Sequence, residues 1–174
     1  RVTIFGSARA KPGTFVYDEV KRVAAALAVM DCDIITGGGP GLMQAANEGA
    51  VSVDPKALER SVGIRVDLPF EQGINPFVGH AYEHRTFFSR LHHFMIVSDA
   101  FVVVPGGIGT LLEMSLVWQL LQVRKLYATP LILVGKMWAE LVVWGRRSML
   151  EEGRELASPV DFSIPHCTND VAET

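Results

Sequence analysis

The chain has 174 residues, of which 49% are hydrophobic, with 16 basic and 19 acidic residues and a formal net charge of −3. This length fits one domain with a substantial core, and we expect a single domain over residues 1–174. The slight negative charge argues against a nucleic-acid-binding protein, because such proteins neutralise phosphates with basic side chains. Any anion that the protein binds must therefore be held by a local site.

No apolar run approaches the roughly 20 residues of a membrane-spanning helix, and the chain opens on a strand-like segment rather than a signal peptide. We therefore expect a cytoplasmic protein with no membrane partner. Cys32 and Cys167 have neither a CxxC nor a metal-ligand spacing, which favours free thiols in a reducing compartment. Because the chain lacks an initiator Met and ends abruptly, we expect it to extend beyond both termini.

Short β-branched runs alternate with longer segments of helical period, the pattern of a parallel sheet covered by helices on both faces. In chain order the pattern predicts a strand at 2–5, a helix at 14–30, a strand at 33–36, a helix at 41–51, a strand at 62–66, a helix at 85–97, a strand at 100–104, a helix at 109–123, a strand at 130–134 and a helix at 137–152. The irregular stretch 67–81 is expected to be a lid or a wall of the site. This order predicts an α/β fold, one Rossmann-like domain with a doubly wound parallel sheet.

Three of the predicted strands end in glycine-rich turns. The first is followed by Gly6 and Ser7, the second by TGGGPG at 36–41, and the fourth by PGGIGT at 105–110. The carboxyl ends of parallel strands share one edge of the sheet, where open α/β sheets bind ligands. Glycines let the backbone approach a ligand closely, and the N-terminus of the next helix presents N–H groups to an anion. Each turn alone is equally explained as a tight corner, but three at one edge favour a phosphate site.

The same turns narrow the choice of phosphate compound. The dinucleotide motif G-x-G-x-x-G is missing after the first strand, and the second strand ends in Thr36 and glycines rather than an acid, which argues against NAD and FAD. No lysine follows any of the turns, so the P-loop motif of ATP hydrolysis is missing as well. A smaller phosphate compound, such as a nucleoside monophosphate, remains as the expected ligand, and we expect no resident cofactor.

Glu113, which follows the third turn, has two interpretations. Thr110 lies three residues earlier, the spacing of a capping box in which threonine and glutamate close a helix N-terminus by reciprocal hydrogen bonds. A carboxylate in the first turn of a helix also faces the mouth of the expected phosphate site. The sequence leaves both interpretations open.

The segments PGGIGTLLE at 105–113 and GGGPGLMQAANEGA at 37–50 together resemble the LOG (Lonely Guy) family of phosphoribohydrolases. The resemblance covers nearly the whole chain. It implies a Rossmann-like fold, a homodimer or an oligomer of dimers, and cleavage of the N-glycosidic bond of nucleoside 5′-monophosphates to a free base and ribose 5-phosphate. Members of this family were long labelled lysine decarboxylases, but no lysine here has the setting that a pyridoxal enzyme needs.

The family pairs the motif glutamate with an arginine in a segment of the form M-x-x-R-K-x-x-M on the preceding helix. The corresponding segment here is FFSRLHHFM, so the resemblance assigns the catalytic roles to Arg90 and Glu113. Phe87 and Leu91 depart from the pattern. The stretch at 68–77 resembles bacterial members that act on ordinary purine and pyrimidine monophosphates rather than cytokinin-activating members.

The resemblance also implies a chemical role for each residue of the site. Glu113 would hold the ribose hydroxyls, stabilise the developing ribosyl cation and help to activate water, while Arg90 would orient the phosphoribosyl unit or favour departure of the base. The 5′-phosphate is expected at Gly106, Gly107, Gly109 and Thr110, with Gly38, Gly39 and Ser7 on the opposite wall. Phe87 and Met95 are placed either to pack on the base or to pack in the core.

Two further features bear on partners. The segment 111–123 is apolar on nearly every face, which is typical of a helix buried all round, so we expect a homodimer with this helix and the 85–97 helix at its interface. The adjacent His92 and His93 would point about 100° apart on a helix, and no metal site is predicted.

The main alternative to the enzyme is a binding protein that carries a nucleotide or a phosphorylated cofactor, such as molybdenum cofactor, without turning it over. Retention of both Arg90 and Glu113 favours the enzyme, because a carrier does not need that pair. A third possibility, a nucleotide sensor that controls a partner protein, has no sequence feature of its own.

Overall fold

The computed structural model describes residues 1–53, 55–67, 73–151 and 154–169. The strands are β1 (Val2–Phe5), β2 (Ile34–Thr36), β3 (Ser61–Val66), β4 (His80–His84), β5 (Ala100–Val103), β6 (Leu131–Val134) and β7 (His166–Thr168). The α-helices are α1 (Phe15–Val29), α2 (Leu42–Val53), α3 (Phe87–Val97), α4 (Ile108–Gln122) and α5 (Lys136–Leu150), and two short 3-10 helices are η1 (Pro55–Arg60) and η2 (Pro159–Ser163).

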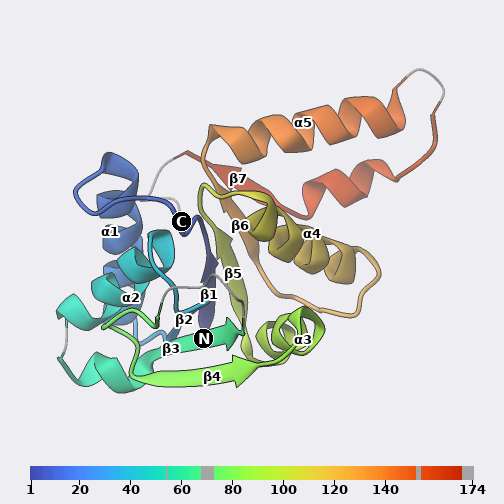
Figure 1. Cartoon of the computed structure of the whole chain (residues 1–174). Coiled ribbons are helices and arrows are strands. Elements are labelled where there is room, and N and C mark those ends of the chain that lie inside the picture. Colours follow the sequence, from blue (N-terminus) through green and yellow to red (C-terminus); the bar gives the residue numbers. More distant parts are fainter. Residues whose placement is uncertain (54, 68–72, 152–153, 170–174) are drawn as a thin grey trace.

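The seven strands form one parallel sheet in the order β4-β3-β2-β1-β5-β6-β7. Helices α1 and α2 pack on one face of this sheet, and α3 and α4 pack on the other (Figure 1). The strand order reverses direction between β1 and β5. The predicted doubly wound α/β fold is therefore confirmed, and the reversal marks the place where open sheets of this kind bind ligands.

The central strands were predictable because both of their faces are buried. Successive side chains of a strand point to opposite faces. In β1, Ile4 joins the core beneath α1 and α2, whereas Phe5 joins the core beneath α3 and α4, and Val102 and Val103 of β5 divide in the same way. Burial on both faces demands the continuous apolar runs that are the signature of a parallel sheet.

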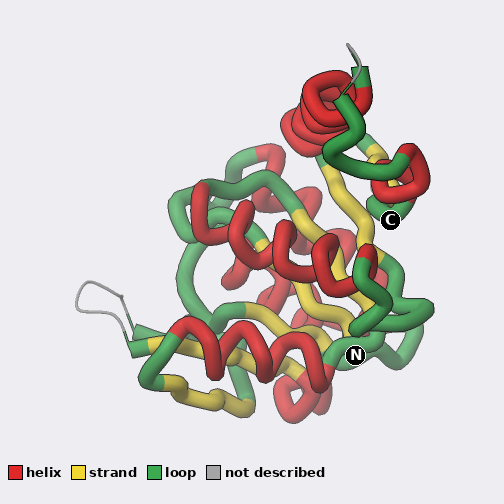
Figure 2. The backbone as a smooth tube through the Cα atoms, turned by 90° about the vertical axis from the view of Figure 1, so that its right-hand side faces the viewer, coloured by secondary structure: helices red, strands yellow, loops and turns green. Residues whose placement is uncertain are grey.

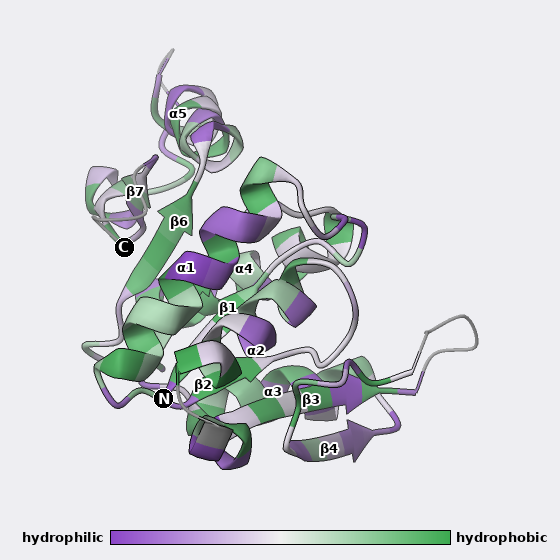
Figure 3. Ribbon diagram, turned by 90° about the vertical axis from the view of Figure 1, so that its left-hand side faces the viewer, coloured by the Kyte–Doolittle hydropathy of each residue, from purple (hydrophilic) through white to green (hydrophobic). Residues whose placement is uncertain are grey.

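Two strands were missed, and the prediction of five strands is wrong on that count. Strand β4 reads HAYEH, and four of its five residues are exposed because it lies at an edge of the sheet. Figure 3 shows the hydrophilic colouring at its end. Residues 80–81, expected to belong to an irregular loop, are the start of this strand, while residues 68–72 lie outside the described residues. Strand β7, at the opposite edge, has only three residues.

The predicted helices agree with the structure to within two residues at each end. Helix α3 begins at Phe87 rather than at residue 85, because Thr86 caps it with a side-chain oxygen that accepts the Ser89 N–H. Helix α5 and η2 stand out from the body of the molecule beyond β6 (Figure 2). Among the described residues, no helix combines the length and hydropathy needed to cross a membrane. Both cysteines are free thiols, as predicted.

Candidate active site

The three glycine turns lie together at the carboxyl edge of the sheet, because β1 pairs with both β2 and β5. Ser7 connects them. Its N–H donates to the carbonyl of Pro105 at 3.1 Å, and its own carbonyl accepts the N–H of Leu42, the first residue of α2, at 2.8 Å. The turns expected to meet are thus held to one another by backbone hydrogen bonds.

The third turn leads directly into α4. Gly107 is the N-cap residue of this helix and makes no side-chain cap, and the segment Gly107 to Gly109 is exposed. The first N–H groups of a helix have no partner within it, so this end of α4 offers donors to an anion from solvent. Thr110, by contrast, is buried. The capping-box interpretation is wrong, because α4 begins at Ile108 and the Glu113 carboxylate bonds to a different partner.

That partner is Arg90 of α3. Its Nη1 donates to Glu113 Oε1 at 2.9 Å, and both side chains are only 11% exposed. The guanidinium is held from two further sides, since its Nε donates to the carbonyl of Ile64 in β3 at 2.8 Å and its Cζ lies 5.1 Å from the ring centroid of Phe94. The two residues that the resemblance paired are therefore in direct contact.

The pKa of Glu113 reflects this setting. Burial raises the pKa of its carboxyl above the ordinary value, because the charged form loses its hydration, and the charge and hydrogen bond of Arg90 oppose that rise. A buried carboxylate with a perturbed pKa beside a ligand-binding edge is a common mark of a functional site.

Gly37, the first glycine of the second turn, leaves room for Arg90. A Cβ atom at this position would lie 2.5 Å from Arg90 Nη2 and 2.7 Å from Met43 Sδ. Any larger residue would have to displace the guanidinium or the thioether. The sequence patterns did not single out Gly37, because its neighbour Arg90 lies 53 positions further along the chain.

The second glycine turn, expected to form the opposite wall of the phosphate site, is buried and already hydrogen-bonded within the protein. Gly38 and Gly39 are buried, and the Gly38 N–H already donates to Thr36 Oγ1 at 2.9 Å. Their carbonyls accept hydrogen bonds from Asn75, in the stretch predicted to be a lid or wall. This turn therefore shapes the site through its backbone, and its Gly38 amide is not available to a phosphate.

The remaining candidates divide between core and surface. Met95 is 8% exposed and packs in the core beneath α3 and α4, which is the second of the two roles considered for it, whereas Phe87 is 44% exposed.

The described histidines do not form a group with the spacing of metal ligands. His84 Nε2 and His93 Nδ1 are hydrogen-bonded at 2.9 Å. His80 and His84 are four residues apart on a strand, which separates them by roughly 13 Å along β4. The described residues contain no group of three metal-ligating side chains.

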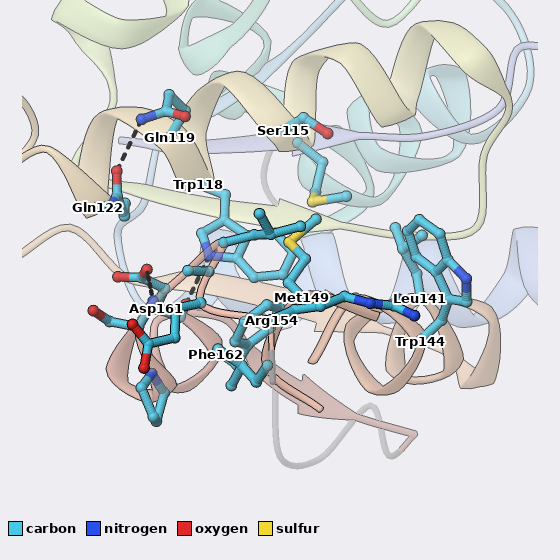
Figure 4. Close-up of a pocket in the computed structure, with 18 of the residues that line it drawn as sticks. Ser115, Trp118, Gln119, Gln122, Leu141, Trp144, Met149, Arg154, Asp161 and Phe162 are labelled. Atoms are coloured by element: carbon cyan, nitrogen blue, oxygen red, sulfur yellow. Dashed lines mark hydrogen bonds between the residues drawn. The ribbon is translucent and has the colours of Figure 1, made fainter. Parts of the chain in front are cut away.

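A large cavity lies on the α5 side of α4, away from the glycine turns. Its volume is about 1050 Å³, and it is lined by residues of α4, α5, η2 and the segment before η2. Figure 4 shows Trp118 of α4, Met149 of α5 and Phe162 of η2 around it. Neither Arg90 nor Glu113 lines this cavity. It is therefore separate from the expected phosphate site.

Comparisons with known proteins give a family and a fold. The family described as possible lysine decarboxylase matches residues 43–174. No curated protein matches the chain. Similar solved structures include the molybdenum cofactor binding protein from the phototrophic bacterium Rippkaea orientalis, 16% identical over 98% of this chain and 90% of that one with a TM-score of 0.69. The molybdenum cofactor carrier protein MCP from Chlamydomonas reinhardtii is 20% identical over 98% of this chain and 91% of that one, with a TM-score of 0.67.

At these identities the structural likeness shows the fold alone. The family match, in contrast, spans 132 of the 174 residues (43 through 174). It includes Arg90 and the PGGIGTLLE segment, which ends at Glu113. On that ground, the chain belongs to the LOG-type family that is described as possible lysine decarboxylase.

Proposed function

We propose that this protein is a nucleoside 5′-monophosphate phosphoribohydrolase, and that it is not a lysine decarboxylase. The observation that carries the proposal is the buried contact between Arg90 and Glu113, 2.9 Å, at the edge where three glycine turns meet. The exposed start of α4 would bind the 5′-phosphate, with Gly106, Gly107, Gly109 and Thr110 around it. The ribose next to that phosphate would then lie close to Glu113.

Hydrolysis breaks the bond between C1′ and the base nitrogen and forms a bond between C1′ and a water oxygen. The base leaves with the electron pair of the broken bond and takes up a proton from solvent. The transition state carries positive charge on the ribose, so a carboxylate beside it is stabilising. Glu113 would supply that charge, bind the ribose hydroxyls and accept a proton from the attacking water. Arg90 holds the Glu113 carboxylate in place and would orient the phosphoribosyl unit.

The lysines do not support the alternative chemistry suggested by the family's description. Lys21 donates to Glu48 at 2.7 Å between α1 and α2, and Lys11, Lys56, Lys125 and Lys136 are exposed. A Schiff-base lysine needs a defined cofactor pocket around its amine.

A second candidate is a carrier of a phosphorylated cofactor. It is favoured by the solved structures of similar fold, which are described as molybdenum cofactor binding and carrier proteins. The glycine turns would serve a carrier equally well. A carrier needs only to hold its ligand and makes no use of a carboxylate that can accept a proton from water, so the buried pair of Glu113 and Arg90 supports the enzyme.

The deciding experiment incubates the protein with AMP, GMP, CMP and isopentenyl-AMP and measures free base and ribose 5-phosphate. Glu113→Gln keeps the shape of the side chain and removes its charge. Glu140→Gln, at an exposed position of α5, is the matched control. Turnover that disappears in Glu113→Gln and persists in Glu140→Gln supports the hydrolase. Tight nucleotide binding by calorimetry without turnover in any form would favour the carrier.

We also propose a homodimer with α3 and α4 at its interface. The apolar side chains that these helices leave exposed include Phe88 at 86%, Ile96 at 66% and Ile108 at 82%. Apolar surface of this kind on neighbouring helices marks an interaction site. Light scattering at micromolar concentration should give the mass of a dimer, and Ile96→Glu should lower it. A monomeric wild-type protein would rule the dimer out.

A further inference from the structure

Four buried polar side chains lie behind the second glycine turn. Thr36, Asn47 and Ser61 are 0% exposed and Asn75 is 4% exposed. Thr36 Oγ1 donates to Asn47 Oδ1 at 2.7 Å, Asn47 Nδ2 donates to Ser61 Oγ at 2.8 Å, and Asn75 Nδ2 donates to Asn47 Oδ1 at 3.0 Å. The network joins β2, α2, β3 and the segment after β3. Its mutual hydrogen bonds explain how so many polar groups can be buried in one place.

Asn75 is the member of the network that holds the turn itself. Its Nδ2 donates a second hydrogen bond to the Gly39 carbonyl at 3.0 Å, and its backbone N–H donates to the Gly38 carbonyl at 2.9 Å. Its Oδ1 accepts the Phe77 N–H at 3.1 Å. Both hydrogens of the amide are therefore used, one on the turn and one on the network.

The turn held in this way touches the proposed catalytic pair. Gly37 lies so close to Arg90 that a Cβ on it would come within 2.5 Å of Nη2. Arg90 in turn holds Glu113. A shift of the Gly37–Gly39 backbone would therefore move the wall that confines the guanidinium.

We propose that Asn75 is a positioning residue: by fixing the carbonyl of Gly39, its side chain sets the wall of the site and so the affinity for a nucleoside monophosphate. This inference rests on the proposed function for its ligand. Asn75 acts from behind the turn, through Gly39, and has no part in the reaction itself.

The test uses Asn75→Asp, which keeps the size of the side chain and the backbone bond to Gly38 but loses both Nδ2 donors. Its carboxylate would face the Gly39 carbonyl and Asn47 Oδ1, which are acceptors. The Gly39 carbonyl would lose its side-chain donor, and a buried carboxylate would face two acceptors, so AMP binding, measured by calorimetry, should weaken by about tenfold or more. At acidic pH a protonated carboxyl regains one donor, so the ratio of its dissociation constant to that of the wild type should shrink.

Ser61→Ala is the matched control, because Ser61 lies at the other end of the network and its hydroxyl accepts a hydrogen bond from Asn47, not from the turn. It removes the acceptor of Asn47 Nδ2 and should lower the Tm while AMP affinity stays within about twofold. Equal losses of affinity in the two variants would mean that the network acts through general stability, and the positioning role would then be wrong. The same conclusion follows if Asn75→Asp leaves AMP affinity unchanged.

Hydrogen exchange of the backbone separates this inference from the proposed function. Asn75→Asp should speed exchange in a peptide that covers residues 36–43, whereas Ser61→Ala should not. If the wild type binds no nucleoside monophosphate, the proposed function fails, and exchange alone decides the role of Asn75. Faster exchange limited to Asn75→Asp supports it, and equal exchange in both variants overturns it.

Discussion

The contact between Arg90 and Glu113 predicts a change in stability that can be measured without any substrate. The variant Arg90→Met keeps an unbranched apolar side chain to pack against Phe94 and removes the guanidinium. Because the two side chains are each only 11% exposed, the variant leaves the Glu113 carboxylate buried without its opposite charge. Breaking a buried ion pair from one side costs about 3–5 kcal/mol of unfolding free energy. Urea denaturation at neutral pH should show a loss of that size.

The loss should depend on pH in one direction. Burial already raises the pKa of Glu113 above 4.5, and Arg90 is what opposes that rise, so the pKa should increase further in the variant. When the pKa of a carboxyl is higher in the native state than in the unfolded state, the protein loses stability as the pH rises above the unfolded-state pKa. The loss is at most about 1.4 kcal/mol per pH unit. Stability is retained below that value, where the carboxyl is protonated in both states. The difference between wild type and Arg90→Met should therefore be largest near neutral pH and shrink in acid.

The double variant Arg90→Met/Glu113→Gln completes the test. It replaces the buried charge by a neutral amide, so it should recover much of the stability lost at neutral pH. Tryptophan fluorescence in urea, repeated at several pH values for the four proteins of the cycle, gives the coupling. A loss that is the same at every pH and is not relieved by Glu113→Gln would refute the reasoning. Arg90 would then stabilise the fold through packing and its bond to Ile64 alone.

Three further predictions concern the surroundings of the pair. Gly37→Ala would place a methyl 2.5 Å from Arg90 Nη2 and should cost about 1–3 kcal/mol in denaturation, whereas Gly73→Ala, with nothing within 4 Å, should cost little. Gly106→Ala would overlap the Thr110 side chain and should disturb the start of α4, so phosphate affinity measured by calorimetry should fall. Burial, followed by the charges of His84 and His92, lowers the pKa of His93, so stability should fall as pH drops below about 6.5. His93→Gln should show a smaller fall in Tm from about pH 7 to about pH 5, and an unchanged fall would contradict that assignment.

The sequence was most informative where local pattern and tertiary environment agree. The bounds of the five predicted strands agree to within one residue with those of β1, β2, β3, β5 and β6. Strands inside a parallel sheet are covered on both faces and need apolar runs, which are visible in the sequence. The glycine turns after three of them could be placed at one edge, because parallel strands share their carboxyl edge. Strand β4 could not be found in this way, since an exposed edge strand has no need of apolar alternation.

The sequence by itself determined the fold class, the meeting of the three turns and, through the family resemblance, the pairing of Arg90 with Glu113. Only the tertiary structure decided that Glu113 bonds to Arg90 and is not part of a capping box, that Gly37 must stay small, and that Asn75 holds the turn. Those facts depend on contacts between residues 23 to 53 positions apart, Arg90 with Glu113 at one extreme and Gly37 with Arg90 at the other. Local periodicity reports which face of an element is buried, but not which distant side chain is buried against it.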